Sequence, residues 1–379
     1  MQWFISVHPK LPTLKALRAV FAQQFTPEAQ AQGFALRDSE GKIRVRLYWN
    51  TEYVGIEALR GYEKAAKKTA AQLLGVGLVR SLPSLDEIRL EPGMQAREAF
   101  VRIATHLLRT MQATQPGTVD DLDIEFLHDF RVALRRTRSL LSELRAIFAP
   151  PVYERWKRNF KAAGTASGAQ RDLDVWLEEL QGCKDDAVLA RVAADRAEAH
   201  RELVGFLNSA AWRNTQKAWE ETLQSPENSR RFTPLAQEPI EALALSRLQR
   251  QLRRVLKDGR TIGADSPAQA LHTLRIDCKK LRYLLEFFAP LFPDTAAMIA
   301  PLKSLQEVLG NHQDAYVQLE RIEVLKKDAA LSGAETQRTL EALTIELHKS
   351  HRYWRKRFAA AFGAFDRHKI RVILEKDRA

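Results

Sequence analysis

The chain has few cysteines and no long hydrophobic run. Its 379 residues include two cysteines, Cys183 and Cys278, and neither stands in a CxxC or other metal-type spacing. We expect free thiols, with Cys278 buried, and a reducing cytoplasm fits this pattern. No run of 18 apolar residues occurs, and the first residues lack the basic and apolar segments of a secretory signal. We therefore expect a cytoplasmic protein without export or a membrane span.

The sequence motifs of common enzyme classes are also absent. The chain has no G-x4-G-K-[ST] loop, no G-x-S-x-G elbow and no HExxH or HxxxH pair. We expect no catalysis, no metal and no cofactor. Positive charge is in excess, because 59 Lys and Arg residues stand against 47 Asp and Glu residues, for a formal net charge of +12. This balance favours a polyanionic partner.

One basic pattern occurs twice. The first copy is His128-x2-Arg131-x3-Arg135-Arg136-x-Arg138, and the second copy, 144 residues later, is His272-x2-Arg275-x3-Lys279-Lys280-x-Arg282. With about 100° per residue on an α-helix, the histidine and the residues 3, 7 and 10 positions later fall within about 80°. Each copy therefore predicts one cationic stripe. Arg136 and Lys280 fall on the other side of the histidine and are weaker candidates.

The apolar residues of the two segments follow a helical spacing of their own. They are Leu127, Phe130, Leu134, Leu141, Leu144 and Phe148 in the first copy, and Leu271, Leu274, Cys278, Leu281, Leu285 and Phe288 in the second. Steps of 3, 4 or 7 residues are typical of a helix face that packs against a core. Both helices are therefore predicted to be amphipathic, with the cationic stripe beside the core face.

The duplication extends beyond these helices. His106 and Arg109 correspond to Arg250 and Arg253 at the same offset, and Lys161 and Lys303 each lie 11 residues before an aspartate, Asp172 and Asp314. We expect each aspartate to pair with an arginine or to cap backbone, because a carboxylate repels phosphate. One departure is Arg171 in the first copy against Gln313 in the second, so the halves need not bind a ligand equally.

Residues 93–379 have helical periodicity almost throughout, with Pro, Gly or Ser at the joints. We expect helices near 94–114, 123–148, 151–181, 185–223, 239–260, 267–289, 294–328 and 334–373. Four long helices per repeat with short connections predict a pair of four-helix bundles, one over 93–235 and one over 236–379. The aromatic residues of the last helix, at 354, 358, 362 and 365, are spaced as a core face.

Residues 1–92 differ from the rest and predict a small α/β region. Strands are expected at 3–7, 34–37 and 42–49, with a hairpin turn at 38–41. Helices are expected at 13–25 and 62–74. Residues 43–49 alternate apolar and polar side chains, which predicts a half-buried strand.

The two basic motifs, each followed by an aspartate in a glycine-containing segment, resemble the conserved histidine α-helical domain, the CHAD family, over about residues 93–379. The resemblance implies a duplicated all-α domain of two four-helix bundles around a basic central channel that binds inorganic polyphosphate. The residues that it implies for binding are His128, Arg131, Arg135, Arg138, His272, Arg275, Lys279 and Arg282, with Lys161, Lys303, His106, Arg109, Arg250 and Arg253 as additions.

Proteins of this family are often fused to a CYTH triphosphatase-like domain, whose first strand carries an E-x-E-x-K pattern. Here Gln2, Phe4 and Ser6 stand where the glutamates are expected. Residues 1–92 therefore resemble at most a degenerate form of that domain, without its metal carboxylates. An unrelated docking module is the alternative.

A linear phosphate chain offers one charge per unit and no base edges, so rows of cations at helical rise suffice to bind it. We predict non-enzymatic binding of inorganic polyphosphate, with association to polyphosphate granules or to enzymes of phosphate metabolism. Three alternatives remain: a nucleic-acid-binding protein, an enzyme acting on polyphosphate, and a structural adaptor. A purely structural role for the two histidines also remains open.

Overall fold

The computed structural model describes residues 2–6, 25–27, 33–37, 43–49, 53–58, 68–69, 78–80, 88–121, 123–224 and 231–367. Contacts divide the chain into two compact units, which we treat separately. Unit 1 comprises Met1–Glu87 and Leu108–Ala133, and unit 2 comprises Ile88–Leu107 and Leu134–Ala379.

Unit 1 contains an antiparallel sheet with the strand order β2-β3-β4-β5-β1-β6. The strands are β1 (Gln2–Ser6), β2 (Phe25–Pro27), β3 (Gly33–Arg37), β4 (Ile43–Trp49), β5 (Tyr53–Ala58) and β6 (Leu78–Arg80). Strands β1, β3 and β4 confirm the three predicted strands, and buried Val45 agrees with the predicted half-buried face of β4. The turn at 38–41 lies outside the described residues, as do residues 13–24 of the predicted helix at 13–25 and all but 68–69 of the helix at 62–74. The prediction was wrong at Phe25, which is the first residue of β2. The α/β class of this region therefore stays a prediction, as does its CYTH-like origin.

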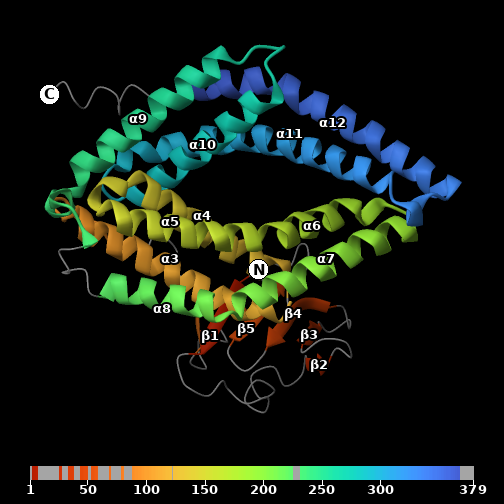
Figure 1. Ribbon diagram of the computed structural model, residues 1–379, viewed down its shortest axis with the longest axis horizontal. Helices are drawn as coiled ribbons and strands as arrows, with labels where there is room; N and C mark the ends of the chain where they lie inside the picture. Colours follow the sequence, from red (N-terminus) through yellow and green to blue (C-terminus); the bar gives the residue numbers. More distant parts are fainter. Residues whose placement is uncertain are drawn as a thin grey trace. The chain divides into compact units, whose positions relative to one another are not determined.

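Long helices make up most of the remaining described chain, with short 3-10 helices and turns between some of them (Figure 1). They are α3 (Ala96–Val119), α4 (Ile124–Glu143), α5 (Pro150–Ala166), α6 (Gly168–Glu179), α7 (Asp186–Leu207), α8 (Ala210–Gln224), α9 (Ile240–Thr261), α10 (Ala268–Phe288), α11 (Ile299–Leu325) and α12 (Ala334–Arg367). Helices α3 and α4 each contribute residues to both units. The all-α fold class predicted from the sequence is confirmed.

The first repeat contains two helix breaks that the periodicity did not reveal. The helix expected at 151–181 ends at Ala166 and restarts at Gly168, with the Ser167 hydroxyl donating to the Ala163 carbonyl at 2.8 Å. The helix expected at 185–223 is divided at 208–209, where the Ser209 hydroxyl accepts from the Trp212 amide at 3.1 Å. Serine offers the backbone an alternative hydrogen bond, so it is suited to such joints. In the second repeat, α11 continues unbroken.

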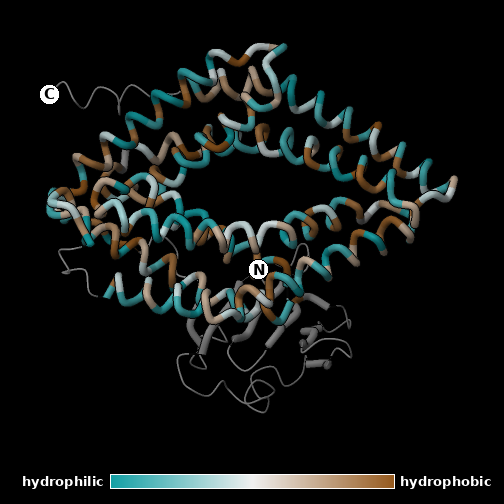
Figure 2. Tube along the Cα trace, in the orientation of Figure 1, coloured by the Kyte–Doolittle hydropathy of each residue, from teal (hydrophilic) through white to brown (hydrophobic). Residues whose placement is uncertain are grey.

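The apolar faces predicted for the two motif helices are buried. All six predicted core residues of α10, including Cys278, are at most 1% exposed. Burial raises the pKa of the Cys278 thiol, and both cysteines are free, as predicted. Figure 2 shows that hydrophobic and hydrophilic positions alternate along the helices of unit 2, in keeping with this amphipathic pattern.

The last helix uses its aromatic face for packing, as the spacing predicts. Phe358, Phe362 and Phe365 are buried. At Gly259 of α9, an added Cβ would lie 2.0 Å from a ring carbon of Phe362. Only a glycine lets the Phe362 ring of α12 lie this close to the α9 backbone. The Arg260 guanidinium also donates twice to the Asp366 carboxylate of α12, at 3.0 and 2.7 Å.

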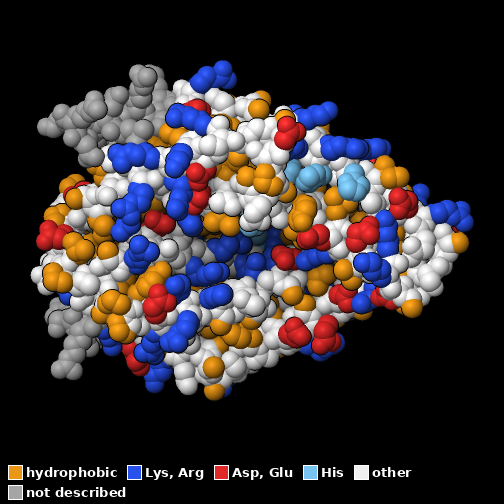
Figure 3. All heavy atoms as spheres, turned by 45° about the horizontal axis from the view of Figure 1, so that its top comes forward, with side chains coloured by type: hydrophobic (Ala, Val, Ile, Leu, Met, Phe, Trp, Pro, Cys, Tyr) orange, Lys and Arg blue, Asp and Glu red, His pale blue; other side chains and the backbone are white. Residues whose placement is uncertain are grey.

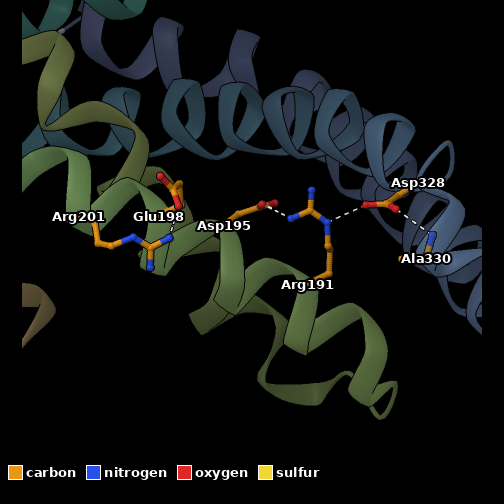
Figure 4. Close-up of polar contacts among 6 residues, drawn as sticks. All are labelled: Arg191, Asp195, Glu198, Arg201, Asp328 and Ala330. Atoms are coloured by element: carbon orange, nitrogen blue, oxygen red, sulfur yellow. Dashed lines mark hydrogen bonds and ion pairs between the residues drawn. The ribbon is translucent and has the colours of Figure 1, made fainter.

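Helices of the two repeats meet within unit 2 at one hydrophobic cluster. Its buried members are Trp176, Leu180, Val188, Val192, Ile322, Leu325, Leu331 and Leu340, which come from α6, α7, α11, α12 and the turns beside them. Beside the cluster, Arg191 of α7 donates to Asp195 of the same helix and, at 2.7 Å, to Asp328 (Figure 4). Asp328 also accepts from the Ala330 amide. Apolar packing and one arginine thus join α7 to the segment between α11 and α12.

Candidate anion-binding site

A cavity of about 460 Å³ in unit 2 is lined by residues of α4, α5 and α10. Its lining residues are Arg135, Arg138, Ser139, Leu141, Ser142, Tyr153, Lys157, Lys161, Arg275, Ile276, Lys279, Lys280 and Tyr283. Seven of these residues are basic and none is acidic. Figure 3 shows Lys and Arg side chains gathered around a hollow on one face of the molecule. The two motif helices therefore contribute to one basic cavity.

Three of the lining cations have a carboxylate partner. Lys157 lies 3.2 Å from Glu154, Arg275 lies 3.7 Å from Asp314, and Lys280 lies 3.3 Å from Asp277. The remaining four, Arg135, Arg138, Lys161 and Lys279, form no ion pair within the described part of the chain. Unpaired cations that face one another repel, and an incoming anion relieves this repulsion. The positive charge in the cavity therefore favours the binding of an anion.

Lys279 is the most perturbed cation of the cavity. Burial, together with the nearby guanidinium groups of Arg275, Arg135 and Arg282, lowers its pKa to about 7, while Asp314 opposes this shift. An ammonium group loses hydration when it is buried and gains nothing from like charges, so it gives up its proton more readily. In the absence of a ligand, a substantial fraction of Lys279 is therefore neutral near pH 7.

Arg138 approaches the backbone of α5 closely. An added Cβ at Gly164 would lie 2.7 Å from the Arg138 Nη1 atom and 3.6 Å from its Cζ atom. The glycine therefore gives the guanidinium room to lie against α5.

The second-repeat equivalent of Arg138 has a different environment. Arg282 is not among the residues that line the cavity, although the sequence places it on the cationic stripe. Its Nε atom lies 3.4 Å from Glu286, which also accepts a hydrogen bond at 2.7 Å from Arg136. Glu286 thus neutralises part of the predicted stripe. No feature of the sequence motif distinguished Arg282 from Arg138, because Glu286 lies outside it.

Several other predicted residues of unit 2 lie away from the cavity lining. Lys303, Arg250 and Arg253 are exposed, and Arg253 donates to Gln249 at 3.4 Å. Neither His272 nor His106 is a lining residue. The His272 Nδ1 atom lies 2.8 Å from the amide oxygen of Gln313, the residue that replaces Arg171 of the first repeat.

Three predicted residues, Arg109, His128 and Arg131, belong to unit 1. The cavity lining consists of unit 2 residues alone. His128 and Arg131 lie on the same continuous helix as Arg135 and Arg138, at the spacing that defines the predicted stripe. Their part in ligand binding stays a prediction.

Other lining residues were missed or ranked low by the sequence analysis. Lys157 lies one helical turn before Lys161 on α5, so an i, i+4 search from Lys161 could have found it. Lys280 lines the cavity despite its position off the predicted stripe. Tyr153, Ser139 and Ser142 gave no signal, because isolated hydroxyl groups occur on most helix surfaces.

Both aspartates pair with an arginine, as predicted. Asp314 lies beside Arg275 of the cavity. The Asp172 carboxylate forms an ion pair with Arg321 of α11 at 3.5 Å, and the Arg321 Nη1 atom donates to the Asp172 carbonyl at 2.8 Å. The Asp314 carboxylate can therefore orient a cavity arginine, whereas Asp172 connects α6 to α11.

Within the described residues, no group of three or more His, Cys, Asp or Glu side chains has an arrangement that could hold a metal ion. None of the described helices is both long and apolar enough to cross a membrane.

A family model and solved structures were found to be similar to this chain. The CHAD domain family model matches residues 102–323, more than half of the chain. A crystal structure of the CHAD domain from the plant Ricinus communis is similar at a TM-score of 0.64 and 23% identity, over 76% of this chain and 97% of that one. PptA from Streptomyces chartreusis is similar at a TM-score of 0.56 and 16% identity, over 72% of this chain and 100% of that one. No curated protein matches the sequence. With a family match over more than half of its length and the same fold in these solved structures, the chain belongs to the CHAD domain family.

Proposed function

We propose that this protein binds inorganic polyphosphate, without chemical turnover, in the basic cavity between α4, α5 and α10. The observation that carries the proposal is the lining of that cavity, in which seven side chains are basic and none is acidic. Membership in the CHAD family supports a role connected with polyphosphate at most. The basic lining of the cavity supports the more specific proposal that the protein binds polyphosphate there. Binding at granules and the accompaniment of phosphate-metabolising enzymes belong to the same proposal.

The chemistry of the lining suits a repetitive anion. Arg135, Arg138 and Arg275 can each present two N–H donors to phosphate oxygens, and the lysines act as point charges. Hydrogen bonds between charged partners contribute about 1.5–3 kcal/mol each. Each phosphate contact also releases condensed counterions, so binding should weaken as salt rises. The lining of the cavity offers contacts to phosphate groups and none that requires a particular base. This favours polyphosphate over a specific nucleic-acid sequence as the ligand.

The test removes the four unpaired cations together. We expect R135A/R138A/K161A/K279A to lose at least about 100-fold in affinity for long-chain polyphosphate at fixed ionic strength, because four charge-assisted contacts disappear. The measurement is a binding titration, with circular dichroism to confirm the fold. The matched control is R338A/K349A/R352A/K356A, which removes the same charge from exposed positions of α12.

Equal losses in both variants would show that net charge alone attracts the polymer and would overturn the proposed site. Competition addresses the other ligand class, since DNA or RNA at equal charge concentration should fail to displace polyphosphate from the cavity. Efficient displacement would favour a nucleic-acid site. Release of orthophosphate in the presence of divalent metal would contradict the non-enzymatic part of the proposal.

A further inference from the structure

Arg138 and Arg282 occupy equivalent positions of the two motifs, and the residues beside them differ. The equivalence of Lys161 with Lys303 and of Asp172 with Asp314 aligns Gly164 of α5 with Gln306 of α11. Gln306 is buried, and its Nε2 atom donates to the Cys278 carbonyl of α10 at 2.6 Å. In the second repeat, the position equivalent to Gly164 thus carries a side chain that is hydrogen-bonded to the backbone of α10.

The two arginines accordingly have different partners. Arg138 lines the cavity, lies within 2.7 Å of the Cβ position of Gly164, and forms no ion pair within the described residues. Arg282 is ion-paired with Glu286 and is absent from the lining. A glycine in a helix interior lowers helix stability relative to alanine, so its useful property here is the close approach that it permits.

We propose that Gly164 positions the Arg138 guanidinium at the cavity, so that the first repeat holds the anion more strongly than the second. Gly164 is a positioning residue, and Arg138 is the group that contacts the ligand. This inference rests on the proposed function, because it assigns unequal roles to the two repeats in that site. A guanidinium held in place loses less conformational freedom when it binds phosphate.

The test is a double-mutant cycle between the two residues. We expect G164A to weaken long-chain polyphosphate binding about five- to tenfold, because the new methyl group displaces the end of the Arg138 side chain. In an R138A background, the same change should have no effect. The matched control is G205A on α7, where an added Cβ has open space. Thermal stability should be equal or higher in both variants, since alanine favours the helix and the displaced arginine end is flexible.

A loss that is equally large in the R138A background would overturn the inference, because Gly164 would then act through α5 itself. An unchanged affinity in G164A would also overturn it. A second measurement separates this inference from the proposed function: phenylglyoxal labelling of Arg138 in the free protein, followed by mass spectrometry. We expect G164A to speed labelling at least about twofold, whereas an unchanged rate would contradict the positioning role even if another anion proved to be the ligand.

Discussion

Helices α4 and α10 carry equivalent basic residues, yet the side chains around those residues differ between the two repeats. Arg135 corresponds to Lys279, and Arg138 corresponds to Arg282. Arg135 and Arg138 form no ion pair within the described residues, whereas Arg282 lies beside Glu286 and Lys279 carries a lowered pKa. The duplicated motif therefore keeps a basic residue at each position, but the neighbouring side chains decide whether that residue is ion-paired or has a shifted pKa.

The difference extends to the helices that support the motif. Gln170 of α6 corresponds to His312 of α11. The amide oxygen of Gln170 lies 3.2 Å from the Nδ1 atom of His200, whereas the His312 ring packs on the His351 ring with centroids 4.1 Å apart. One repeat pairs an amide with an imidazole, and the other pairs two imidazoles. We expect the second repeat to be the more sensitive to pH.

The largest expected effect comes from comparing the two arginines directly. R138A should weaken polyphosphate binding about twentyfold, because it removes a cation that forms no ion pair within the described residues. R282A should weaken it less than about threefold, because Glu286 already neutralises that charge. Titrations of the two variants at one salt concentration measure the difference. Equal losses would remove the distinction between the repeats.

The next effect concerns Lys279, whose lowered pKa of about 7 should make binding depend on pH. The groups that face it are Arg135 of α4, Arg275 and Arg282 of α10, and Asp314 of α11. An anion favours the charged ammonium and raises its pKa, so binding takes up a proton at pH values above about 7. Affinity should increase up to about tenfold as pH falls from 8.5 to 7, and then level off.

Isothermal titration in buffers of different ionisation enthalpy measures this proton uptake. The control is K279R, which installs the residue type of the first repeat and stays charged throughout this range. We expect K279R to bind with little pH dependence between 7 and 8.5. A wild-type protein that binds without net proton uptake at pH 8 would show that Lys279 is already charged in the free state.

The smallest effect concerns acid stability. Burial, together with the nearby His351 and Arg355, lowers the pKa of His312 to about 4. The unfolded chain takes up the proton first as pH falls below about 6.5, so stability should decrease between pH 6.5 and 4, by on the order of 1 kcal/mol. H312Q installs the residue of the first repeat and should reduce this decrease.

Urea unfolding at pH 7 and pH 5 measures how much the free energy of unfolding changes between the two pH values. This difference does not depend on any change in stability that H312Q causes equally at both pH values. The exposed His348 provides the control, because H348Q should leave the difference between the two pH values nearly unchanged. An identical pH dependence in wild type and H312Q would locate the acid sensitivity elsewhere.

Periodicity predicted the helices well where side-chain spacing alone decides the structure. The apolar faces of α4 and α10 were predicted because their residues recur every three or four positions, and the same holds for the aromatic face of α12. The breaks at Ser167 and at 208–209 were not predicted, because each depends on local serine hydrogen bonds within an otherwise helical pattern. The strand β4 followed from the alternation of apolar and polar side chains.

The candidate site was predicted in part. Arg135, Arg138, Lys161, Arg275 and Lys279 line one cavity, as the duplicated motif suggested. Helical spacing makes the i, i+4 pairs Arg282–Glu286 and Lys157–Lys161 possible. It could not show that Glu286 would also bind Arg136 of α4, or that α5 would lie beside the cavity, because both facts depend on how helices pack. The roles of His128, Arg131 and Arg109 stay predictions.

The sequence by itself determined the helical class, the duplication and the positions of the cationic residues, because each follows from residue type and spacing along one helix. The tertiary structure decided which of those cations share a cavity and which are neutralised. Charge is a property of a residue, but the energy of a charge depends on burial and on neighbours from other helices. Gly164 of α5 is such a neighbour of Arg138, whereas Glu286 reaches Arg282 from the next turn of the same helix. Because of these two residues, the equivalent motifs are unequal.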